Sequence, residues 1–452
     1  MSRKLFGTDG VRGKANVWPM TSEVALKLGR ALAVLFKNFK HSKVVIGKDT
    51  RRSGYMLENA LSSGVCSAGA EAVLLGPLPT PAIAFITTAM RANAGAVISA
   101  SHNPYFDNGI KFFDHTGFKL PDSLELKLED LIAQDEFEKN LPTCEEIGRA
   151  HRVEDAPGRY IEHLKSTFPK NLTLDGIKMV IDCANGSAYH VSPIIFEELG
   201  AEVIRVGVQP NGLNINEACG ALHPESMCQK VKDEGADIGI ALDGDADRVV
   251  LCDEKGEKID GDVILAIAAR EMKKQKLLKN NTVVATVMSN FGLERFLKEE
   301  GIGLIRTPVG DRYVVECMRS QGFNLGGEQS GHLIFSDHAS TGDGTLAALQ
   351  VLSIMKKTGL SLSSLKTLMA CIPQVLVNVK VKEKKALDQF PHLQKKMAQA
   401  QTRLAGQGRI LLRYSGTEPL VRIMAEGENE NLVREILEDL REEILKSLGA
   451  AA

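Results

Sequence analysis

Aromatic side chains are scarce in this chain of 452 residues, and only one of them is a tryptophan. They make up 5% of the sequence, which argues against a stacking platform for single-stranded nucleic acid. The formal net charge is −2, so the chain has no overall basic field that would attract DNA or RNA. The sequence therefore predicts no nucleic-acid partner.

Long apolar runs and paired cysteines are also missing. No apolar stretch approaches the length of a membrane-spanning helix, and the opening MSRKLFGTDG lacks the apolar core of a signal peptide. The eight cysteines include no CxxC pair, which argues against a zinc site or a disulfide framework. We expect reduced cysteines, no membrane partner and a cytoplasmic location.

A repeated pattern of strand, helix, strand, helix and strand occupies the first three quarters of the chain. A predicted helix over residues 21–37, with Thr21 as its N-cap, precedes the first copy. The three copies have their predicted strands at residues 44–47, 72–76 and 94–100, then 179–182, 202–207 and 237–242, then 283–287, 304–307 and the approach to 324–332. The helix after the first strand is expected to begin at about Tyr55.

These strands are continuous apolar runs, as expected when helices cover both faces of a sheet. The last section differs, because residues 375–384 alternate like an antiparallel strand. The sequence thus predicts an α/β protein. Three related α/β domains with mixed sheets are expected at residues 1–157, 158–258 and 259–370, and a smaller C-terminal α+β domain at 371–452, around a central cleft.

A polar motif closes each copy just past a strand end, where ligands sit in open α/β sheets. The first motif is SHNP, and it places Ser101 where the strand gives way to a turn. A serine at such a place can be a nucleophile exposed in a cleft, although Asn-Pro also marks simple turns. Ser99 is a rival nucleophile two residues earlier, and we prefer Ser101.

The second motif, DGDADR, is the strongest local signal. Asp243, Asp245 and Asp247 alternate, so in an extended segment their carboxylates would share one side. Three neighbouring carboxylates repel one another unless a cation lies between them. Oxygen-only ligands favour Mg²⁺, and an EF-hand is excluded because the loop is too short. Arg248 ends this motif.

Two further motifs offer groups for a phosphorylated sugar. GGEQSGH supplies Glu328 and Ser330, which suit hydroxyl groups, and His332, which can transfer a proton. RYSGTEPLVR resembles an anion site built from the following residues: Arg413, Ser415, Gly416, Thr417 and Arg422. FGTDGVRG and GIK add the cations Arg12 and Lys111, each of which alone would be read as a surface charge.

The four main motifs, in this order and spacing, resemble the α-D-phosphohexomutase superfamily over essentially the whole chain. FGTDGVRG, TPVGDRYV and GEQSGH are most similar to its bacterial phosphoglucosamine mutase branch. The resemblance implies a phosphorylated serine at Ser101, and one Mg²⁺ held by Ser101 and the three aspartates. It assigns sugar contacts to Glu328 and Ser330. The other implied roles are phosphate binding by Arg413, Ser415, Gly416, Thr417 and Arg422, and assistance to transfer by Arg12, Lys111, Arg248 and His332.

The activity that this resemblance implies is interconversion of glucosamine 6-phosphate and glucosamine 1-phosphate, which supplies UDP-N-acetylglucosamine synthesis. A hexosamine or glucose 1,6-bisphosphate would serve as intermediate and activator. The partner would be a small phosphosugar, and the sequence leaves room for a homodimer. Three alternatives stay open: a phosphomannomutase or phosphoglucomutase, a Mg²⁺ phosphatase that hydrolyses the serine ester, and a sugar-phosphate sensor without turnover.

Overall fold

The computed structural model describes residues 5–7, 9–36, 42–134, 141–414 and 420–449. The chain folds into two compact units. One unit consists of Met1–Thr286 with Ile305–Thr367, and the other of Val287–Leu304 with Leu368–Ala452.

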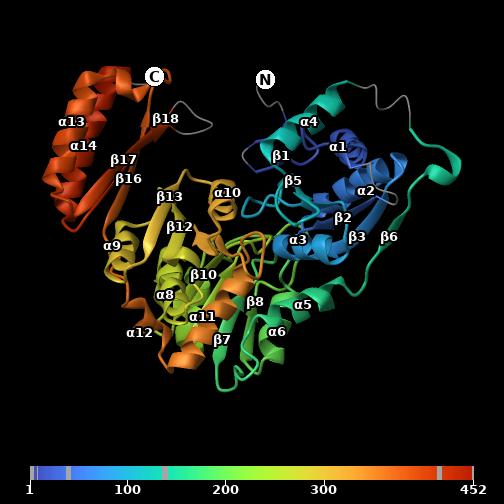
Figure 1. Ribbon diagram of the computed structural model, residues 1–452, viewed down its shortest axis with the longest axis horizontal. Coiled ribbons are helices and arrows are strands. Elements are labelled where there is room, and N and C mark those ends of the chain that lie inside the picture. The colour runs from blue at the N-terminus through green and yellow to red at the C-terminus, as the bar shows by residue number, and fades with distance from the viewer. Residues whose placement is uncertain (1–4, 8, 37–41, 135–140, 415–419, 450–452) are drawn as a thin grey trace. The chain divides into compact units, whose positions relative to one another are not determined.

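The first sheet of the larger unit has six strands in the order β1-β5-β4-β2-β3-β6 (Figure 1). It is mixed, since β2 runs parallel to β3 and β4 while β5 is antiparallel to β4 and β1. Its strands are β1 (Val11–Lys14), β2 (Lys43–Lys48), β3 (Glu71–Pro77), β4 (Ala94–Ile98), β5 (Asp107–Asp114) and β6 (Ala150–Arg152). The accompanying helices are α1 (Ser22–Leu35), α2 (Arg52–Ser67), α3 (Thr80–Ala89), α4 (Asp122–Ala133), the short η2 (Cys144–Glu146) and α5 (Ala156–Ser166).

The expected first helix is confirmed as α1, and the hydroxyl of its N-cap Thr21 accepts a hydrogen bond from the Val24 N–H at 3.4 Å. The second helix begins at Arg52 rather than near Tyr55. The first turn of α2 therefore includes the polar residues Arg52 and Ser53, which the apolar pattern alone does not assign to a helix.

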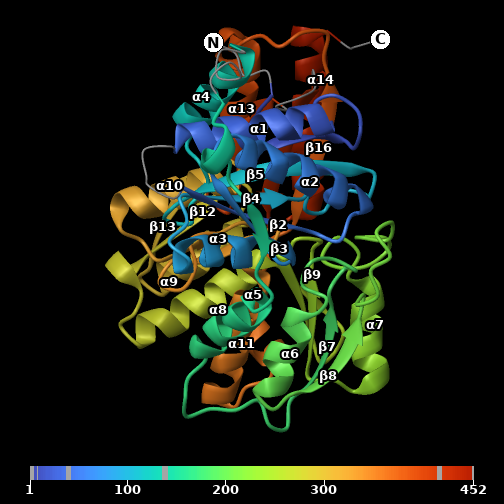
Figure 2. The ribbon, with the colours of Figure 1, turned by 90° about the vertical axis from the view of Figure 1, so that its right-hand side faces the viewer.

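The second sheet has five strands in the order β11-β10-β9-β7-β8. Strand β7 is parallel to β8 and β9, and β10 is antiparallel to β9. Figure 2 shows α7 on one side of this sheet and α6 on the other. The elements are β7 (Lys178–Asp182), α6 (Val191–Glu198), β8 (Glu202–Val206), α7 (Glu225–Glu234), β9 (Ile238–Leu242), β10 (Val249–Asp253) and β11 (Lys258–Ile259).

The third sheet has four strands in the order β13-β12-β14-β15. Strand β12 is parallel to β14, and β15 is antiparallel to β14. The elements of this part are α8 (Gly261–Lys274), η3 (Lys279–Asn281), β12 (Thr282–Thr286), β13 (Gly303–Thr307), α10 (Asp311–Gln321), β14 (Leu325–Gly327), β15 (Leu333–Phe335), α11 (Gly344–Thr358) and α12 (Leu362–Lys366).

The three sheets share one local arrangement. In each sheet, a strand that is parallel to its neighbour leads into a motif loop: β4 beside β2, β9 beside β7 and β14 beside β12. After the loop the chain forms the next strand antiparallel to the first: β5, β10 and β15. The loops are residues 99–106, 243–248 and 328–332. The expectation of mixed sheets with the motifs at equivalent strand ends is confirmed.

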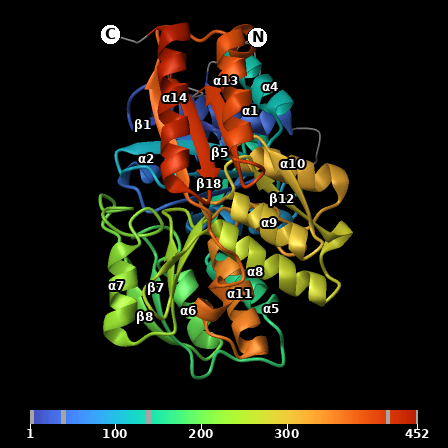
Figure 3. The same cartoon turned by 90° about the vertical axis from the view of Figure 1, so that its left-hand side faces the viewer.

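The smaller unit contains an antiparallel sheet in the order β16-β18-β17. Figure 3 shows α13 and α14 side by side against these strands, and their contacts bury one apolar cluster. The strand expected from residue 375 is confirmed as β16 (Gln374–Lys380). The other elements are α9 (Phe291–Glu299), η4 (Leu387–Gln389), α13 (Pro391–Arg403), β17 (Gly408–Tyr414), β18 (Leu420–Gly427) and α14 (Glu430–Leu448).

Two of the expected absences can be examined in the described part of the chain. All eight cysteines lie there, and each is a free thiol. Among the helices described, none combines the length and the apolar character that a bilayer crossing requires.

Candidate active site

Ser101 follows strand β4, and its side chain points to the aspartate loop of the second sheet. Its Oγ donates a hydrogen bond to Asp243 Oδ2 at 2.6 Å and lies 3.1 Å from Nδ1 of His102. The hydroxyl of Ser99 instead accepts the Ser101 N–H at 2.9 Å. Ser101 was expected to be exposed at its strand end, but it is 1% exposed because the loop around Gly244 packs against its carbonyl.

The three aspartates of the second loop gather their carboxylates at one point. One oxygen from each of Asp243, Asp245 and Asp247 lies within 4.8 Å of the others, and all three residues are buried. The expected extended segment is wrong. The loop is a turn in which Ala246 has a φ of 58° and donates its N–H to the Asp243 carbonyl at 3.0 Å. The turn, rather than strand alternation, makes the carboxylates converge.

This cluster fits a divalent cation better than it fits three free carboxylates. Burial, followed by the charges of Asp247 and Asp245, raises the pKa of Asp243 well above its ordinary value. Asp245 Oδ1 and Asp247 Oδ1 are buried without a hydrogen-bond partner. Buried carboxylate oxygens that accept no hydrogen bond are costly, and a hard cation such as Mg²⁺ takes this kind of ligand. The three aspartates can therefore hold a metal ion.

Lys111, on strand β5, lies among the same carboxylates. Its Nζ is 3.1 Å from Asp245 Oδ2, 3.2 Å from Asp9 Oδ2 and 3.7 Å from Asp247 Oδ2. Burial alone would lower the pKa of Lys111, but these carboxylates more than offset it and raise the pKa. Lys111 is thus a fixed cation. Thr80, at the start of α3, also binds the cluster through its hydroxyl, which donates to Asp245 Oδ2 at 2.7 Å.

Arg12 lies beside the serine loop. Its guanidinium pairs with Asp9, and Nη1 donates to the carbonyl of Ala100 at 3.5 Å. Burial and then the charges of Arg248 and Arg12 lower the pKa of His102 to about 4. The imidazole next to Ser101 is therefore neutral near pH 7.

Arg248 and His332 bring the second and third loops together through an isolated antiparallel bridge. The Arg248 N–H donates to Asp243 Oδ1 at 3.1 Å. His332 Nδ1 lies 3.7 Å from Asp247 Oδ2, while its Nε2 accepts the Gly342 N–H at 3.1 Å. The structure therefore places both residues at the aspartate cluster.

Glu328 and Ser330 form a second pair on the third loop. Glu328 Oε1 accepts the Gly310 N–H at 3.0 Å, and the Ser330 hydroxyl donates to Oε2 at 3.4 Å. Burial alone would lower the pKa of Arg248, but the surrounding carboxylates, Glu328 among them, raise it. Glu328 is therefore one of the carboxylates near Arg248, the residue that ends the aspartate loop.

Lys119, Asp9 and Asp311, which no sequence pattern singles out, form a charged chain beside His332. Lys119 Nζ bridges Asp9, at 2.6 Å, and Asp311, whose Oδ2 lies 3.6 Å from His332 Nε2. These contacts join the first sheet to the helix α10 of the third. Asp9 lies in FGTDGVRG and Asp311 in TPVGDRYV, two of the segments that carry the family resemblance, but only Arg12 of the first is a predicted site residue.

In the smaller unit, Arg413 and Arg422 lie directly opposite each other on β17 and β18. Burial, followed by the charge of Arg422, lowers the pKa of Arg413. The Nε atoms of both are buried without a hydrogen-bond partner. Facing like charges destabilise a sheet, so this pair suits an anion. Three further expected phosphate-binding residues, Ser415, Gly416 and Thr417, lie outside the described residues.

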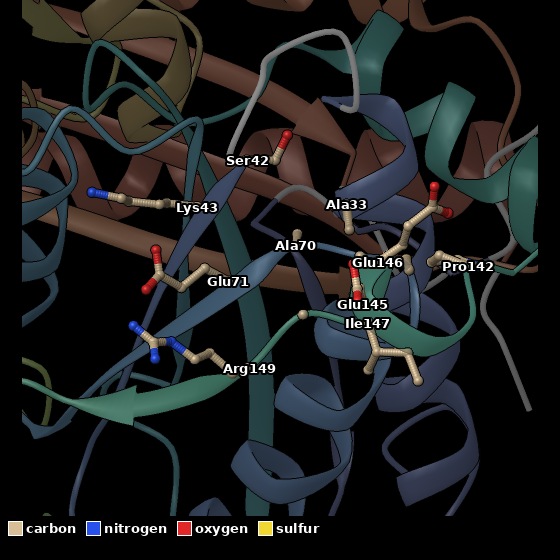
Figure 4. Close-up of a pocket in the computed structure, with 13 residues that line it drawn as sticks. Ala33, Ser42, Lys43, Ala70, Glu71, Pro142, Glu145, Glu146, Ile147 and Arg149 are labelled. Carbon is tan, nitrogen blue, oxygen red and sulfur yellow. The ribbon is translucent and has the colours of Figure 1, made fainter.

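A cavity of about 850 Å³ lies elsewhere in the larger unit, at the start of strands β2 and β3 (Figure 4). Lys43, Glu71 and Arg149 are among its lining residues. The Ser101 loop follows the carboxyl end of β4, and β2 and β4 are parallel. The cavity therefore lies at the opposite ends of the strands. It is separate from the candidate active site.

Comparison with known families finds four matching models in chain order. They are described as phosphoglucomutase/phosphomannomutase domains I, II and III, all alpha/beta/alpha, and the C-terminal domain. The matched residues are 3–139, 158–256, 260–372 and 376–443.

Among curated proteins, the phosphoglucosamine mutase of Citrifermentans bemidjiense is 58% identical over 451 residues and covers 100% of this chain and 99% of its own. That of Geobacter metallireducens is 56% identical, covering 99% of both chains. Among solved structures, a phosphoglucomutase/phosphomannomutase family protein from Burkholderia thailandensis has a TM-score of 0.82 at 23% identity. It covers 99% of this chain and 98% of its own, a likeness of fold. The resemblance noted in the sequence is confirmed.

Proposed function

This chain belongs to the phosphoglucomutase/phosphomannomutase family, and we propose that it interconverts glucosamine 6-phosphate and glucosamine 1-phosphate. The observation that carries the chemistry is the Ser101 hydroxyl, 2.6 Å from a buried cluster of three carboxylates. The substrate follows from relatives of full-length similarity that are named phosphoglucosamine mutase.

In the proposed cycle, Ser101 carries a phosphoryl group on Oγ. The group passes to O1 of glucosamine 6-phosphate, which gives a 1,6-bisphosphate. The bisphosphate then reorients so that its 6-phosphoryl group faces Ser101, and this group is transferred to the serine. Each transfer breaks one P–O bond and forms another, and the proton lost by the attacking hydroxyl is matched by the proton gained by the departing one.

The residues around Ser101 supply positioning and charge, which dominate catalysis of phosphoryl transfer. Lys111, Arg12 and Arg248 are cations close to the transferred group. His332, held by Asp247 and Gly342, is the group that we assign to proton movement at the sugar oxygen. Glu328 and Ser330 are assigned to sugar hydroxyls.

Ser101, Asp243, Asp245 and Asp247 are the residues that we propose to hold one Mg²⁺ per chain. When bound, the ion would neutralise negative charge on the phosphoryl oxygens. Asp245 Oδ1 and Asp247 Oδ1, which are buried without a hydrogen-bond partner, support this assignment. A hexosamine or glucose 1,6-bisphosphate would restore phosphate to Ser101 whenever the intermediate escapes.

We further propose four domains, with boundaries near residues 157, 258 and 370, a cytoplasmic location and a phosphosugar as the partner. In the smaller unit, the described residues Arg413 and Arg422 are assigned to a phosphate of the sugar that is not being transferred. Ser415, Gly416 and Thr417 keep the same assigned role on the basis of sequence.

The proposed substrate is tested by a competition assay. Purified protein, Mg²⁺ and a trace of glucose 1,6-bisphosphate are supplied with glucosamine 6-phosphate, glucose 6-phosphate or mannose 6-phosphate. We expect the highest kcat/KM for glucosamine 6-phosphate, with the 1-phosphate as product. Preference for glucose or mannose phosphates would favour a phosphoglucomutase or phosphomannomutase, and release of free phosphate would favour a phosphatase.

Replacing Arg422 with alanine should weaken the binding of phosphosugars. A charge-assisted hydrogen bond is worth about 1.5–3 kcal/mol, which corresponds to roughly 10- to 100-fold in Kd. Both glucosamine 6-phosphate and glucosamine 1-phosphate should be affected, as measured by calorimetric titration. Arg434→Ala, which removes an exposed arginine paired with Glu430 on α14, is the matched control. Equal affinity of wild type and Arg422→Ala for both sugar phosphates would show that Arg422 does not bind the phosphosugar.

A further inference from the structure

The backbone of the serine loop is held by two donors that come from different sheets. Arg51 Nη2 donates to the carbonyls of Ser101, at 2.9 Å, and of Asn103, at 2.8 Å. Asn216 Nδ2 donates to the same two carbonyls, at 2.9 and 3.1 Å. The two donors therefore meet at one pair of acceptors immediately after the proposed nucleophile.

Both donors are themselves fixed. Arg51 is fully buried, and its Nε and N–H donate to the carboxylate of Asp49 at 2.8 and 2.9 Å. Asn216 is 8% exposed, and its N–H donates to the carbonyl of Ala184 at 2.9 Å. Neither side chain is a mobile surface group, so each can impose a geometry on the loop.

The loop that carries Asn216 also reaches the first sheet elsewhere. The Arg52 N–H donates to the Gly212 carbonyl at 2.9 Å. The adjoining loop after β7 makes a similar contact, since the Thr50 hydroxyl donates to the Asn185 carbonyl at 2.6 Å. A Cβ at Gly244 would lie 2.7 Å from the Ser101 carbonyl oxygen and 2.8 Å from Asn216 Nδ2. Serine loop, aspartate loop and Asn216 thus pack as one body.

The conformation that these contacts hold is one that a serine does not adopt freely. Ser101 has a φ of 50°, and non-glycine residues stay in this region only when the surroundings determine it. Fixing the carbonyl fixes the peptide plane that follows Ser101. Together with the hydrogen bond from the Ser101 N–H to Ser99, this orients the Cα–Cβ bond and aims Oγ at Asp243.

We propose that Asn216 is a positioning residue for phosphoryl transfer, which acts through the carbonyls of Ser101 and Asn103. This inference rests on the proposed function of Ser101. The property required is donation by the amide nitrogen, rather than the volume of the side chain, because two carbonyl oxygens face that nitrogen. An aspartate has the shape of asparagine but would present an oxygen to both carbonyls.

The test compares the kcat values of two variants, because hydrogen-bond donation and packing predict opposite rankings. Asn216→Asp should lower kcat by roughly 10- to 100-fold, as expected for a misplaced reacting group, with KM within about twofold of the wild-type value. Asn216→Ala, which removes the donor without adding a repelling oxygen, should lower kcat less. A packing role predicts the reverse order. The same order should appear in the rate at which phosphate-free Ser101 gains phosphate from glucose 1,6-bisphosphate, followed by intact mass.

Asn214→Asp and Asn214→Ala, in the same loop but bonded to Gln209 and Asn211, are the matched controls and should behave as wild type. The inference is overturned if kcat is unchanged in both Asn216 variants, if Asn216→Asp is the more active, or if only KM changes. Should Asn216→Asp not fold, Asn216→Ala alone decides, since an unchanged kcat there overturns it. Wild-type protein that gains no phosphate on Ser101 would instead refute the proposed function.

Discussion

Replacing Ser101 with alanine should abolish turnover of glucosamine 6-phosphate while the protein remains folded. The side chain contributes one hydroxyl and no apolar packing, so its loss leaves the core intact. The proposed cycle has no other carrier for the phosphoryl group. Removing the nucleophile of a serine hydrolase costs about 10⁶-fold in kcat, and a loss on this scale is expected here. The measurement is the initial rate of glucosamine 1-phosphate formation, together with thermal unfolding.

Two controls distinguish the loss of the Ser101 hydroxyl from a change in the backbone conformation at this position. Ser101→Gly also lacks the hydroxyl but adopts without strain the left-handed conformation that residue 101 has, so it should be as inactive as Ser101→Ala. Phosphate-free wild-type protein should regain activity when glucose 1,6-bisphosphate is added, and neither variant should. If Ser101→Ala turns over substrate and peptide mapping finds the phosphate on Ser99, the assignment of the nucleophile is wrong.

Much of the fold was predictable because each buried strand is a short apolar run with a polar loop at its end. The aspartate loop between β9 and β10 is the clearest case, since apolar strands lead into and out of it. Those strands fix where the loop lies in the sheet. Its internal shape could not be predicted, because the turn depends on Ala246 at positive φ, and alanine carries no sequence signal for that conformation.

The residues that were missed act across long sequence separations. Thr80 reaches Asp245 and Asn216 reaches Ser101, contacts that join one sheet to another. Each of these side chains is individually ordinary in its own segment. Their roles arise from the packing of loops from two sheets, and no periodicity in the sequence shows which threonine or asparagine will face the site.

Replacing Asp245 with asparagine should reduce turnover severely, and the structure explains why this change is selective. Asp245 Oδ2 accepts hydrogen bonds from Thr80 and Lys111, whereas Oδ1 is buried without a partner. The carbonyl oxygen of asparagine can keep the first two contacts. Its amide group then replaces the oxygen that is free for a metal ion. The fold should therefore survive while one charged ligand is lost.

We expect kcat to fall by about 10²–10³-fold, the range seen when one preorganised electrostatic group is removed from an active site. Exhaustive chelation of the wild-type protein should also abolish activity, and Mg²⁺ should restore it. Independently of activity, Mg²⁺ should raise the melting temperature of the wild type more than that of Asp245→Asn, because ligands that bind only the folded state stabilise it. Asp233→Asn, at an exposed position of helix α7, is the control for the loss of one charge. Full activity after chelation, or equal stabilisation of Asp245→Asn and wild type by Mg²⁺, would show that the aspartate cluster does not bind the metal.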